Sequence, residues 1–285
     1  MAETPFILDG AMGTELIRRG VGCPLPLWSA DANITHPETV TQIHQDYINA
    51  GSTVITTNTF RSTTWTYKKA GRTEKSARER AKQSLYGAVE SAQKAKKSSV
   101  RIAGSITSIE DCYSPEKFPG KSAAEETYGE TLEWLDDAGV DLILFETMGN
   151  REEIEIGLKL SQSIQLPIWL SLIMRDKNYI LDGTEIRNTI SAIPLNAVNC
   201  LLMNCNTLEI TLEAIDRIKK NWDGCWGAYP NLGKTDYEND YFDILDESNF
   251  TAGIKSILEK KPDVLGVCCG SSPNHINQLT QIIKK

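Results

Sequence analysis

Basic residues are not in excess in this 285-residue sequence. Its 30 Lys and Arg residues stand against 38 Asp and Glu residues, which gives a formal net charge of −8 at pH 7 and a pI of about 5.1. Proteins that bind nucleic acid usually present a basic face to the phosphate backbone. The composition therefore argues against a nucleic-acid partner and leaves small-molecule and cationic ligands open.

Long apolar runs are also missing. None approaches the roughly 20 residues needed to cross a bilayer, and residues 1–5 lack the basic and apolar blocks of a signal peptide. Hydrophobic residues still make up 40% of the chain, which is enough for one large core. We expect a cytoplasmic protein with no membrane partner.

Histidine is scarce, whereas cysteine is not. Of the three His residues, His36 and His44 fall in one expected helical segment and its cap, and His275 begins another helix, so surface or packing roles are expected. Seven cysteines are an odd number in a chain too large to need disulfide staples. Reduced thiols or metal ligands are the better interpretation.

Eight short apolar segments alternate with helical or helix-sized segments. Strands that are apolar on nearly every residue indicate a parallel sheet covered on both faces. Eight such units in a chain of this length predict a closed (β/α)8 TIM barrel that forms a single domain over residues 1–285. The expected strands are 6–8, 52–57, 100–106, 141–147, 167–173, 197–205, 224–229 and 264–270.

An open, doubly wound sheet is the rival architecture. Folds of that kind bind dinucleotides at a G-x-G-x-x-G turn that follows a strand. The turn at residues 9–14 reads D-G-A-M-G-T, so the sequence does not carry that signature. The closed barrel is therefore the preferred prediction.

Two connections have local signals of their own. Thr35 is followed three residues later by Glu38, which is a capping-box pattern and predicts a helix that opens at Thr35 and runs to about Ala50. Residues 236–242 are acidic and aromatic, and they are expected to form a loop between the last two barrel strands.

Polar side chains stand at the ends of the expected strands. In a (β/α)8 barrel the C-terminal strand ends face one mouth, where catalysis takes place. Three thiols, two acids and two amides at one mouth indicate a functional site more strongly than any one of these groups alone. These residues are Asp9, Asn58, Glu146, Cys205, Asn231, Cys268 and Cys269.

The adjacent pair Cys268 and Cys269 has a plain alternative, because free cysteine is often a small buried hydrophobe. Cys205 favours a metal site over simple packing. It ends an expected strand that is separated from the last strand by a single strand, so its thiol can reach an ion bound by Cys268 and Cys269. Thiolates suit Zn²⁺, and three protein ligands leave its fourth position open for substrate. The sequence therefore predicts a zinc centre at the mouth.

Six motifs, in order along nearly the whole chain, together resemble the homocysteine S-methyltransferase family. That family commonly has Gly-Gly before Cys-Cys-Gly, and Val267 replaces the second of those glycines here. The motifs are DGAMGTEL at 9–16, TNTF at 57–60, FET at 145–147, NCN at 204–206, YPN at 229–231 and GVCCG at 266–270.

The resemblance implies a role for each site residue. The three cysteines would bind Zn²⁺, and Asn231 would occupy the open zinc position when substrate is absent. Glu146 would receive the amino group of homocysteine. The other residues assigned to the substrate are Asp9, Gly10 and Asn58.

The resemblance also implies an activity, methyl transfer from S-methylmethionine or S-adenosylmethionine to the thiolate of L-homocysteine, in EC class 2.1.1. Trp28 is a candidate to face the sulfonium donor by cation–π attraction, with a buried rim tryptophan as the alternative. Betaine or a separate corrinoid protein as methyl source, and a non-catalytic zinc- or thiol-binding barrel, remain open. A homo-oligomer is compatible with the sequence.

Overall fold

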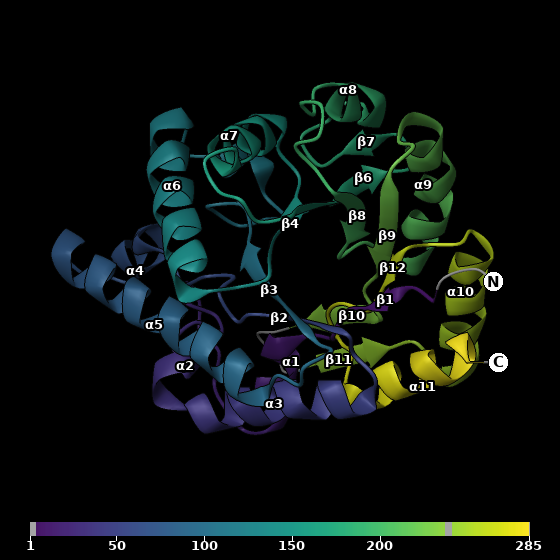
Figure 1. Cartoon of the computed structure of the whole chain (residues 1–285), viewed down its shortest axis with the longest axis horizontal. Helices are drawn as coiled ribbons and strands as arrows, with labels where there is room; N and C mark the ends of the chain where they lie inside the picture. Colours follow the sequence, from purple (N-terminus) through teal and green to yellow (C-terminus); the bar gives the residue numbers. More distant parts are fainter. Residues whose placement is uncertain (1–3, 237–240, 285) are drawn as a thin grey trace.

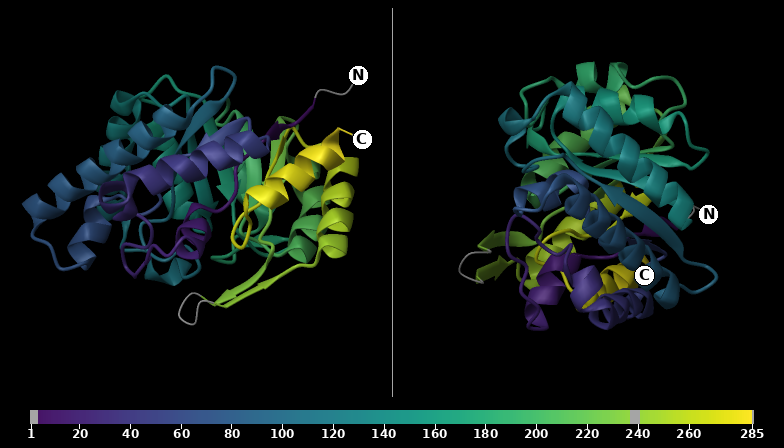
Figure 2. Two further views of the ribbon diagram at one scale, coloured as in Figure 1. Left: turned by 90° about the horizontal axis from the view of Figure 1, so that it is seen from below. Right: turned by 90° about the vertical axis from the view of Figure 1, so that its left-hand side faces the viewer.

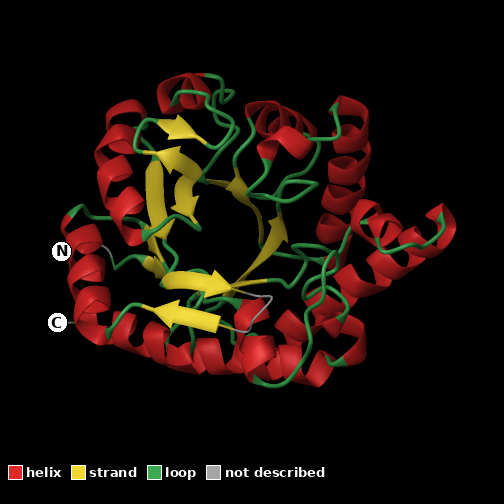
Figure 3. Ribbon diagram, turned by 180° about the vertical axis from the view of Figure 1, so that it is seen from behind, coloured by secondary structure: helices red, strands yellow, loops and turns green. Residues whose placement is uncertain are grey.

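A ring of parallel strands surrounded by helices forms the body of the protein (Figures 1 and 3). The computed structural model describes residues 4–236 and 241–284. The strands pair in the order β1-β12-β9-β8-β5-β4-β3-β2, and every pairing in this sheet is parallel. The bounds are β1 (Phe6–Ile7), β2 (Val54–Thr56), β3 (Arg101–Ile106), β4 (Leu142–Met148), β5 (Ile168–Leu172), β8 (Cys200–Asn204), β9 (Cys225–Tyr229) and β12 (Val264–Leu265).

Backbone contacts between β1 and β2 close the ring. Leu8 forms a parallel bridge with Val54, and the amide of Asp9 donates to the carbonyl of Val54 at 3.0 Å. On the other side, the amide of Thr53 donates to the carbonyl of Ile7 at 2.8 Å. The predicted single-domain (β/α)8 barrel is therefore confirmed.

Helices cover the outside of the ring. The face that each longer helix turns to the strands is apolar, with buried residues at helical spacing such as Ala77, Ala81, Leu85 and Ala88. The helices are α1 (Met12–Arg18), α2 (Ala32–Thr35), α3 (Pro37–Ala50), α4 (Thr64–Lys69), α5 (Glu74–Ala95), η1 (Pro115–Lys117), α6 (Lys121–Ala138), α7 (Arg151–Ser161), α8 (Ile186–Ser191), α9 (Leu208–Asn221), α10 (Glu247–Glu259) and α11 (Pro273–Ile283).

The predicted start of the helix at Thr35 is wrong. Thr35 ends the short helix α2, where its hydroxyl donates to the carbonyl of Asp31 at 2.9 Å. His36 precedes α3 with φ −140° and ψ 48°. Because Pro37 disfavours helical backbone in the residue before it, the chain breaks at His36 and α3 starts at the proline.

The segment expected to be a plain loop before the last strand is partly a hairpin. β10 (Gly233–Asp236) and β11 (Tyr241–Ile244) pair antiparallel, with Gly233 opposite Ile244. Residues 237–240 of the expected loop lie outside the described residues. Figure 2 shows the hairpin projecting from the barrel body. A second small hairpin follows β5 and pairs β6 (Met174–Asp176) with β7 (Tyr179–Ile180).

The barrel interior is packed with side chains. Leu8, Leu142, Leu144, Trp169 and Leu202 belong to one buried apolar cluster on the strands, so the ring is a filled core and not a channel. The mouth at the C-terminal strand ends is left for ligands. Among the described residues, no helix is long and apolar enough to cross a membrane.

Candidate functional site

Three thiols converge at the barrel mouth. Cys205 directly follows β8, and Cys268 and Cys269 lie just beyond β12. Their Sγ atoms all lie within 4.8 Å of one another, with Cys205 2.6 Å from Cys268 and 4.0 Å from Cys269. Only β9 lies between the two contributing strands, so their ends are near enough to bring all three sulfur atoms together.

The loop after β9 holds both arms of this cluster. The amide of Cys268 donates to the carbonyl of Pro230 at 2.8 Å, and the amide of Leu232 donates to the carbonyl of Cys269 at 3.1 Å. Cys205 has a positive φ of 54°, an uncommon backbone conformation for a residue other than glycine. The side-chain amide of Asn231 donates to the backbone carbonyl of Cys205 at 3.1 Å. The surroundings thus keep Cys205 turned toward its partners.

Without a cation, Cys205 and Cys268 stay protonated at neutral pH. Contact with the neighbouring thiols, together with burial, raises the pKa of Cys205 well above its ordinary value. The pKa of Cys268 is also raised, because the hydrogen bond from Cys205, which acts to lower it, is outweighed by contact with Cys269 and by burial. A cluster that strongly disfavours thiolate charge is suited to a metal ion, which supplies the missing positive charge.

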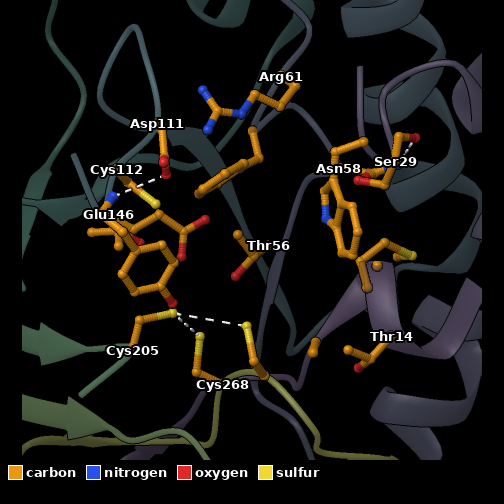
Figure 4. A pocket seen from close by; sticks show the side chains of 18 of the residues that line it. Thr14, Ser29, Thr56, Asn58, Arg61, Asp111, Cys112, Glu146, Cys205 and Cys268 are labelled. Carbon is orange, nitrogen blue, oxygen red and sulfur yellow. Dashed lines mark hydrogen bonds between the residues drawn. The ribbon is translucent and has the colours of Figure 1, made fainter. Parts of the chain in front are cut away.

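A cavity of about 530 Å³ opens over the thiols. The three cysteines line it together with Asp9, Glu146 and Arg61. Figure 4 shows Cys205 and Cys268 at one end, Arg61 and Asp111 at the other, and Glu146 and Thr56 drawn between them. A substrate in this cavity can reach the sulfur cluster and the carboxylates of Asp9 and Glu146 at the same time.

Glu146 projects into the cavity from β4. Its Oε1 accepts a hydrogen bond from the hydroxyl of Ser105 at 2.5 Å, and its Oε2 accepts one from the hydroxyl of Tyr229 at 3.3 Å. Burial raises the pKa of Glu146 to about 7, and the two hydrogen bonds act against that rise. The carboxylate is fixed in place and readily ionised by an incoming cation.

Asp9 follows β1 and is buried. Its Oδ2 accepts a hydrogen bond from the amide of Thr56 at 2.9 Å. Burial raises the pKa of Asp9 to about 8, and the charge of Glu146 adds to that effect. Two acids in one cavity, Asp9 buried and Glu146 half-buried, both with raised pKa values, form a candidate site for a cationic group.

Gly10 permits a close approach behind Asp9. A Cβ at Gly10 would lie 2.4 Å from Oγ of Ser271 and 2.7 Å from the ring of Tyr47. The same Ser271 hydroxyl accepts from the amide of Ala11 at 2.9 Å. The glycine therefore lets the turn after β1 pack tightly against the segment that follows the cysteine pair.

The family model described as homocysteine S-methyltransferase matches residues 6–283. The chain belongs to the homocysteine S-methyltransferase family. It is thereby placed among the methyltransferases of EC class 2.1.1, and the resemblance seen in the sequence motifs is confirmed.

Individual relatives agree. A homocysteine S-methyltransferase of Escherichia coli (strain K12) is 30% identical, with 80% of this chain and 78% of the relative covered. Homocysteine S-methyltransferase 2 of Zea mays is 25% identical over 98% of this chain and 90% of the relative. The metallated form of the homocysteine methyltransferase MmuM from Escherichia coli superposes with a TM-score of 0.84 at 26% identity, covering 98% and 96% of the two chains.

In this member of the homocysteine S-methyltransferase family, Asn58 lines the cavity with its side chain already engaged. Its Nδ2 donates to the carbonyl of Ser29 at 2.9 Å and to Oδ1 of Asn33 at 2.8 Å. Its Oδ1 accepts from the hydroxyl of Ser29 at 2.6 Å. Asn58 therefore ties the segment around residue 29 to the end of β2.

Trp28 also lines the cavity, from the segment between α1 and α2. A Cβ at Gly13 would lie 2.5 Å from Nε1 of Trp28, so the indole packs directly on the backbone there. Trp28 has a positive φ of 51°. Its position is compatible both with a ligand contact and with a packed rim residue.

Three of the four remaining cysteines lie at opposite ends of the barrel. Cys112 is buried on the cavity wall, where burial raises the pKa of its thiol to about 12. Cys200 and Cys225 begin β8 and β9 at paired positions, with their Sγ atoms 2.7 Å apart. These two lie at the strand starts, away from the mouth.

Sequence reasoning missed several residues that shape the site. Ser105 and Tyr229 hold Glu146, and His44 lies 3.9 Å from Asp9, measured from Nδ1 to Oδ2. Arg61 lines the cavity as well. Ser105 and Tyr229 lie at or next to the C-terminal ends of expected strands, so the strand-end rule that found Glu146 pointed to them too. No comparable signal marked His44, which sits inside a helix.

Proposed function

We propose that this chain transfers a methyl group from a small sulfonium donor, S-methylmethionine or S-adenosylmethionine, to the thiolate of L-homocysteine, forming methionine. One observation carries the proposal. Cys205, Cys268 and Cys269 meet at the floor of a cavity whose wall holds two carboxylates, Asp9 and Glu146. The reaction class agrees with the family to which the chain belongs.

The residues present fit Zn²⁺. Zinc–sulfur bonds of about 2.3 Å in a tetrahedron keep two sulfur ligands about 3.8 Å apart. Cys205 and Cys269 are already 4.0 Å apart, whereas Cys205 and Cys268, at 2.6 Å, have to separate by about 1.2 Å. In addition, Oδ1 of Asn231 is buried with no hydrogen-bond partner among the described residues, which suits its assignment to the open position when substrate is absent.

Bound zinc would lower the pKa of the homocysteine thiol so that it binds as a nucleophilic thiolate. The chain's own part is to hold the amino-acid end. Glu146 and Asp9 line the same cavity, and their ionised forms pair with the α-ammonium group. The positive charge of the ammonium group opposes the effect of burial, which raises the pKa values of Asp9 and Glu146. Substrate binding therefore favours the ionised form of both carboxyl groups.

Charge favours a cationic donor. Three thiolates and one Zn²⁺ carry a formal charge of −1, and the homocysteine thiolate makes it −2, which attracts a sulfonium. In the transfer, a bond forms between the homocysteine sulfur and the methyl carbon. The bond between that carbon and the donor sulfur breaks, and its electron pair stays on the donor, which leaves as a neutral thioether. Trp28 is assigned to the cation's approach.

The test is methionine formation by zinc-loaded protein with homocysteine and, in turn, S-methylmethionine, S-adenosylmethionine and betaine. Turnover with either sulfonium is expected. Turnover with betaine alone, or only with an added corrinoid protein, would replace the proposed donor. Bound zinc with no methyl transfer from any donor would indicate a non-catalytic barrel. The reaction is assigned to the cytoplasm, where thiols stay reduced.

A matched pair of variants tests the metal ligands. Cys269→Ser removes one proposed ligand, and we expect metal and methyl transfer to be lost together while the barrel still folds. Cys225→Ser changes a thiol at the other end of the barrel and is expected to keep both. Full activity of Cys269→Ser would contradict the assignment.

A further inference from the structure

Among the described residues, three cationic side chains line the cavity, and one of them differs from the other two. Lys69 forms an ion pair with Glu110, and Nζ of Lys117 lies 3.9 Å from Oδ2 of Asp111. Arg61 takes part in no ion pair within the described residues, although it lines the same cavity. Its charge acts on the buried Glu153, where burial raises the pKa of that carboxyl and the guanidinium helps to lower it, but no carboxylate of the described residues is in direct contact with Arg61. A guanidinium at a ligand cavity without a carboxylate in direct contact is a candidate anion site.

Arg61 is nevertheless held in place. One of its terminal nitrogens donates to the carbonyl of Glu110 at 2.5 Å, and the guanidinium carbon lies 5.1 Å from the centre of the Phe60 ring. The Glu110 side chain is itself anchored by the indole N–H of Trp65 at 2.9 Å. Because a guanidinium carries five N–H donors, this anchoring leaves a preorganised fork for an anion.

Arg61 also lies far from the thiols within the cavity. Figure 4 places it at the opposite end from Cys205 and Cys268, with Glu146 drawn between them. A ligand that touches Arg61 therefore occupies the end of the cavity opposite Cys205 and Cys268. The homocysteine amino-acid end is assigned to the acids Asp9 and Glu146.

We propose that Arg61 binds the carboxylate of the methyl donor, an inference that rests on the sulfonium donor of the proposed function. The reasoning is electrostatic. A guanidinium repels a sulfonium and attracts a carboxylate, whereas the thiolate centre does the reverse. A donor carrying both groups is thereby oriented with its carboxylate at Arg61 and its sulfonium toward the thiolates. Arg61 thus selects sulfonium amino acids over simple sulfonium ions.

Two methyl donors distinguish carboxylate binding by Arg61 from a general effect of Arg61 on activity. S-Methylmethionine carries the carboxylate, and trimethylsulfonium is a methyl donor that lacks it. In Arg61→Gln, we expect kcat/KM for S-methylmethionine to fall about ten- to hundredfold, the range for one lost charged hydrogen-bonding partner. Trimethylsulfonium should keep its kcat/KM within about twofold, and the KM for homocysteine should stay unchanged.

Two further variants serve as controls. Arg61→Lys keeps the charge but loses the fork, so an intermediate loss with S-methylmethionine is expected. Lys117→Gln removes a cation that is already paired with Asp111 and should leave the donor preference unchanged. Equal losses with both donors in Arg61→Gln, or a rise in the homocysteine KM alone, would overturn the proposal.

Direct binding separates failure of this inference from failure of the proposed function. Titration calorimetry of S-methylmethionine into metal-loaded protein should show weaker binding to Arg61→Gln than to the parent, whether or not turnover occurs. If the parent transfers no methyl group from any donor but this difference persists, the proposed reaction fails and the carboxylate site stands. Equal affinity of parent and variant would refute the carboxylate site.

Discussion

Asp9 and His44 face each other inside the protein, with Oδ2 of the carboxylate 3.9 Å from Nδ1 of the imidazole. Both side chains are buried, and neither ring nitrogen of His44 has a hydrogen-bond partner among the described residues. Burial raises the pKa of Asp9 to about 8 and lowers that of His44 to about 4. At pH 7 the two groups therefore meet mainly as neutral partners and not as an ion pair.

Asp9 makes stability and substrate affinity respond to pH in opposite directions. In the unfolded chain an aspartate loses its proton near pH 4, whereas folded Asp9 keeps it to about pH 8. Between these values the folded state binds more protons, so the free energy of unfolding falls as pH rises. Asp9→Asn should flatten that slope, as measured by urea denaturation of metal-free protein at pH 5, 6.5 and 8. An unchanged slope would contradict the raised pKa.

Ligand binding should show the reverse trend. The α-ammonium group needs ionised acids, so affinity should increase as pH rises through about 7 to 8. L-Homoserine is the cleaner probe because its hydroxyl does not titrate in this range. Asp9→Asn should weaken the binding of L-homoserine and remove the rise in affinity near pH 8. The rise near pH 7, which is assigned to Glu146, should remain.

Glu146→Gln should separate substrate binding from metal binding. The amide cannot pair with the α-ammonium group, so the KM for homocysteine should rise about ten- to hundredfold. Metal content, measured by elemental analysis, should stay at the parent level, because Glu146 is not among the clustered thiols. Tyr229→Phe removes one hydrogen bond to Glu146 and should have a smaller effect in the same direction. Unchanged homocysteine KM in Glu146→Gln would rule out this role.

Metal binding should release protons. The pKa values of Cys205 and Cys268 are raised in the metal-free cluster, so both thiols are protonated at pH 7 and must lose their protons to a metal. Calorimetry at pH 7 in buffers of different ionisation enthalpy should show release of about two or more protons per ion. Cys268→Ser should release fewer. Proton release near zero in the parent would mean that the thiols do not take up the metal.

Gly10 should tolerate no side chain. Its Cβ would lie 2.4 Å from Oγ of Ser271 and 2.7 Å from the Tyr47 ring, so Gly10→Ala should lower the free energy of unfolding by about 1 to 3 kcal/mol. Gly129, inside α6, has nothing within 4 Å of its Cβ position. Gly129→Ala should be neutral or stabilising by up to about 1 kcal/mol. Equal changes in the free energy of unfolding for the two variants, measured by urea denaturation, would show that Ser271 and Tyr47 move aside from a side chain at residue 10 at little cost.

The barrel could be predicted because its signal repeats along the chain. Each apolar strand and each following helix reports the same architecture, so local errors do not change the result. The error at Thr35 arose because Pro37 overrides a capping pattern that looks complete on its own. The hairpin of β10 and β11 was missed since its sequence carries no Asn-Gly or Asp-Gly turn.

Only those site residues that lie at the ends of strands could be predicted from the sequence. Cys205 and Cys268 follow strands whose ends must share a mouth, so their meeting follows from the fold. The partners of Asp9 and Glu146 depend on tertiary contacts instead. Tyr229 reaches Glu146 across 83 residues, and His44 reaches Asp9 from a helix outside the ring. The strand-end rule places Ser105 and Tyr229 at the mouth, but it does not give their contacts with Glu146, and it gives no sign of His44.

Cys205 and Cys268 are 63 residues apart in the chain, and the segment between them contains β9, its hairpin and α10. An ion gripped by both would act as a reversible cross-link that removes loop entropy from the unfolded chain, as a disulfide does. The last third of the barrel should then come apart first when the ion is withdrawn, and hydrogen exchange should quicken there before it quickens around β3 and β4.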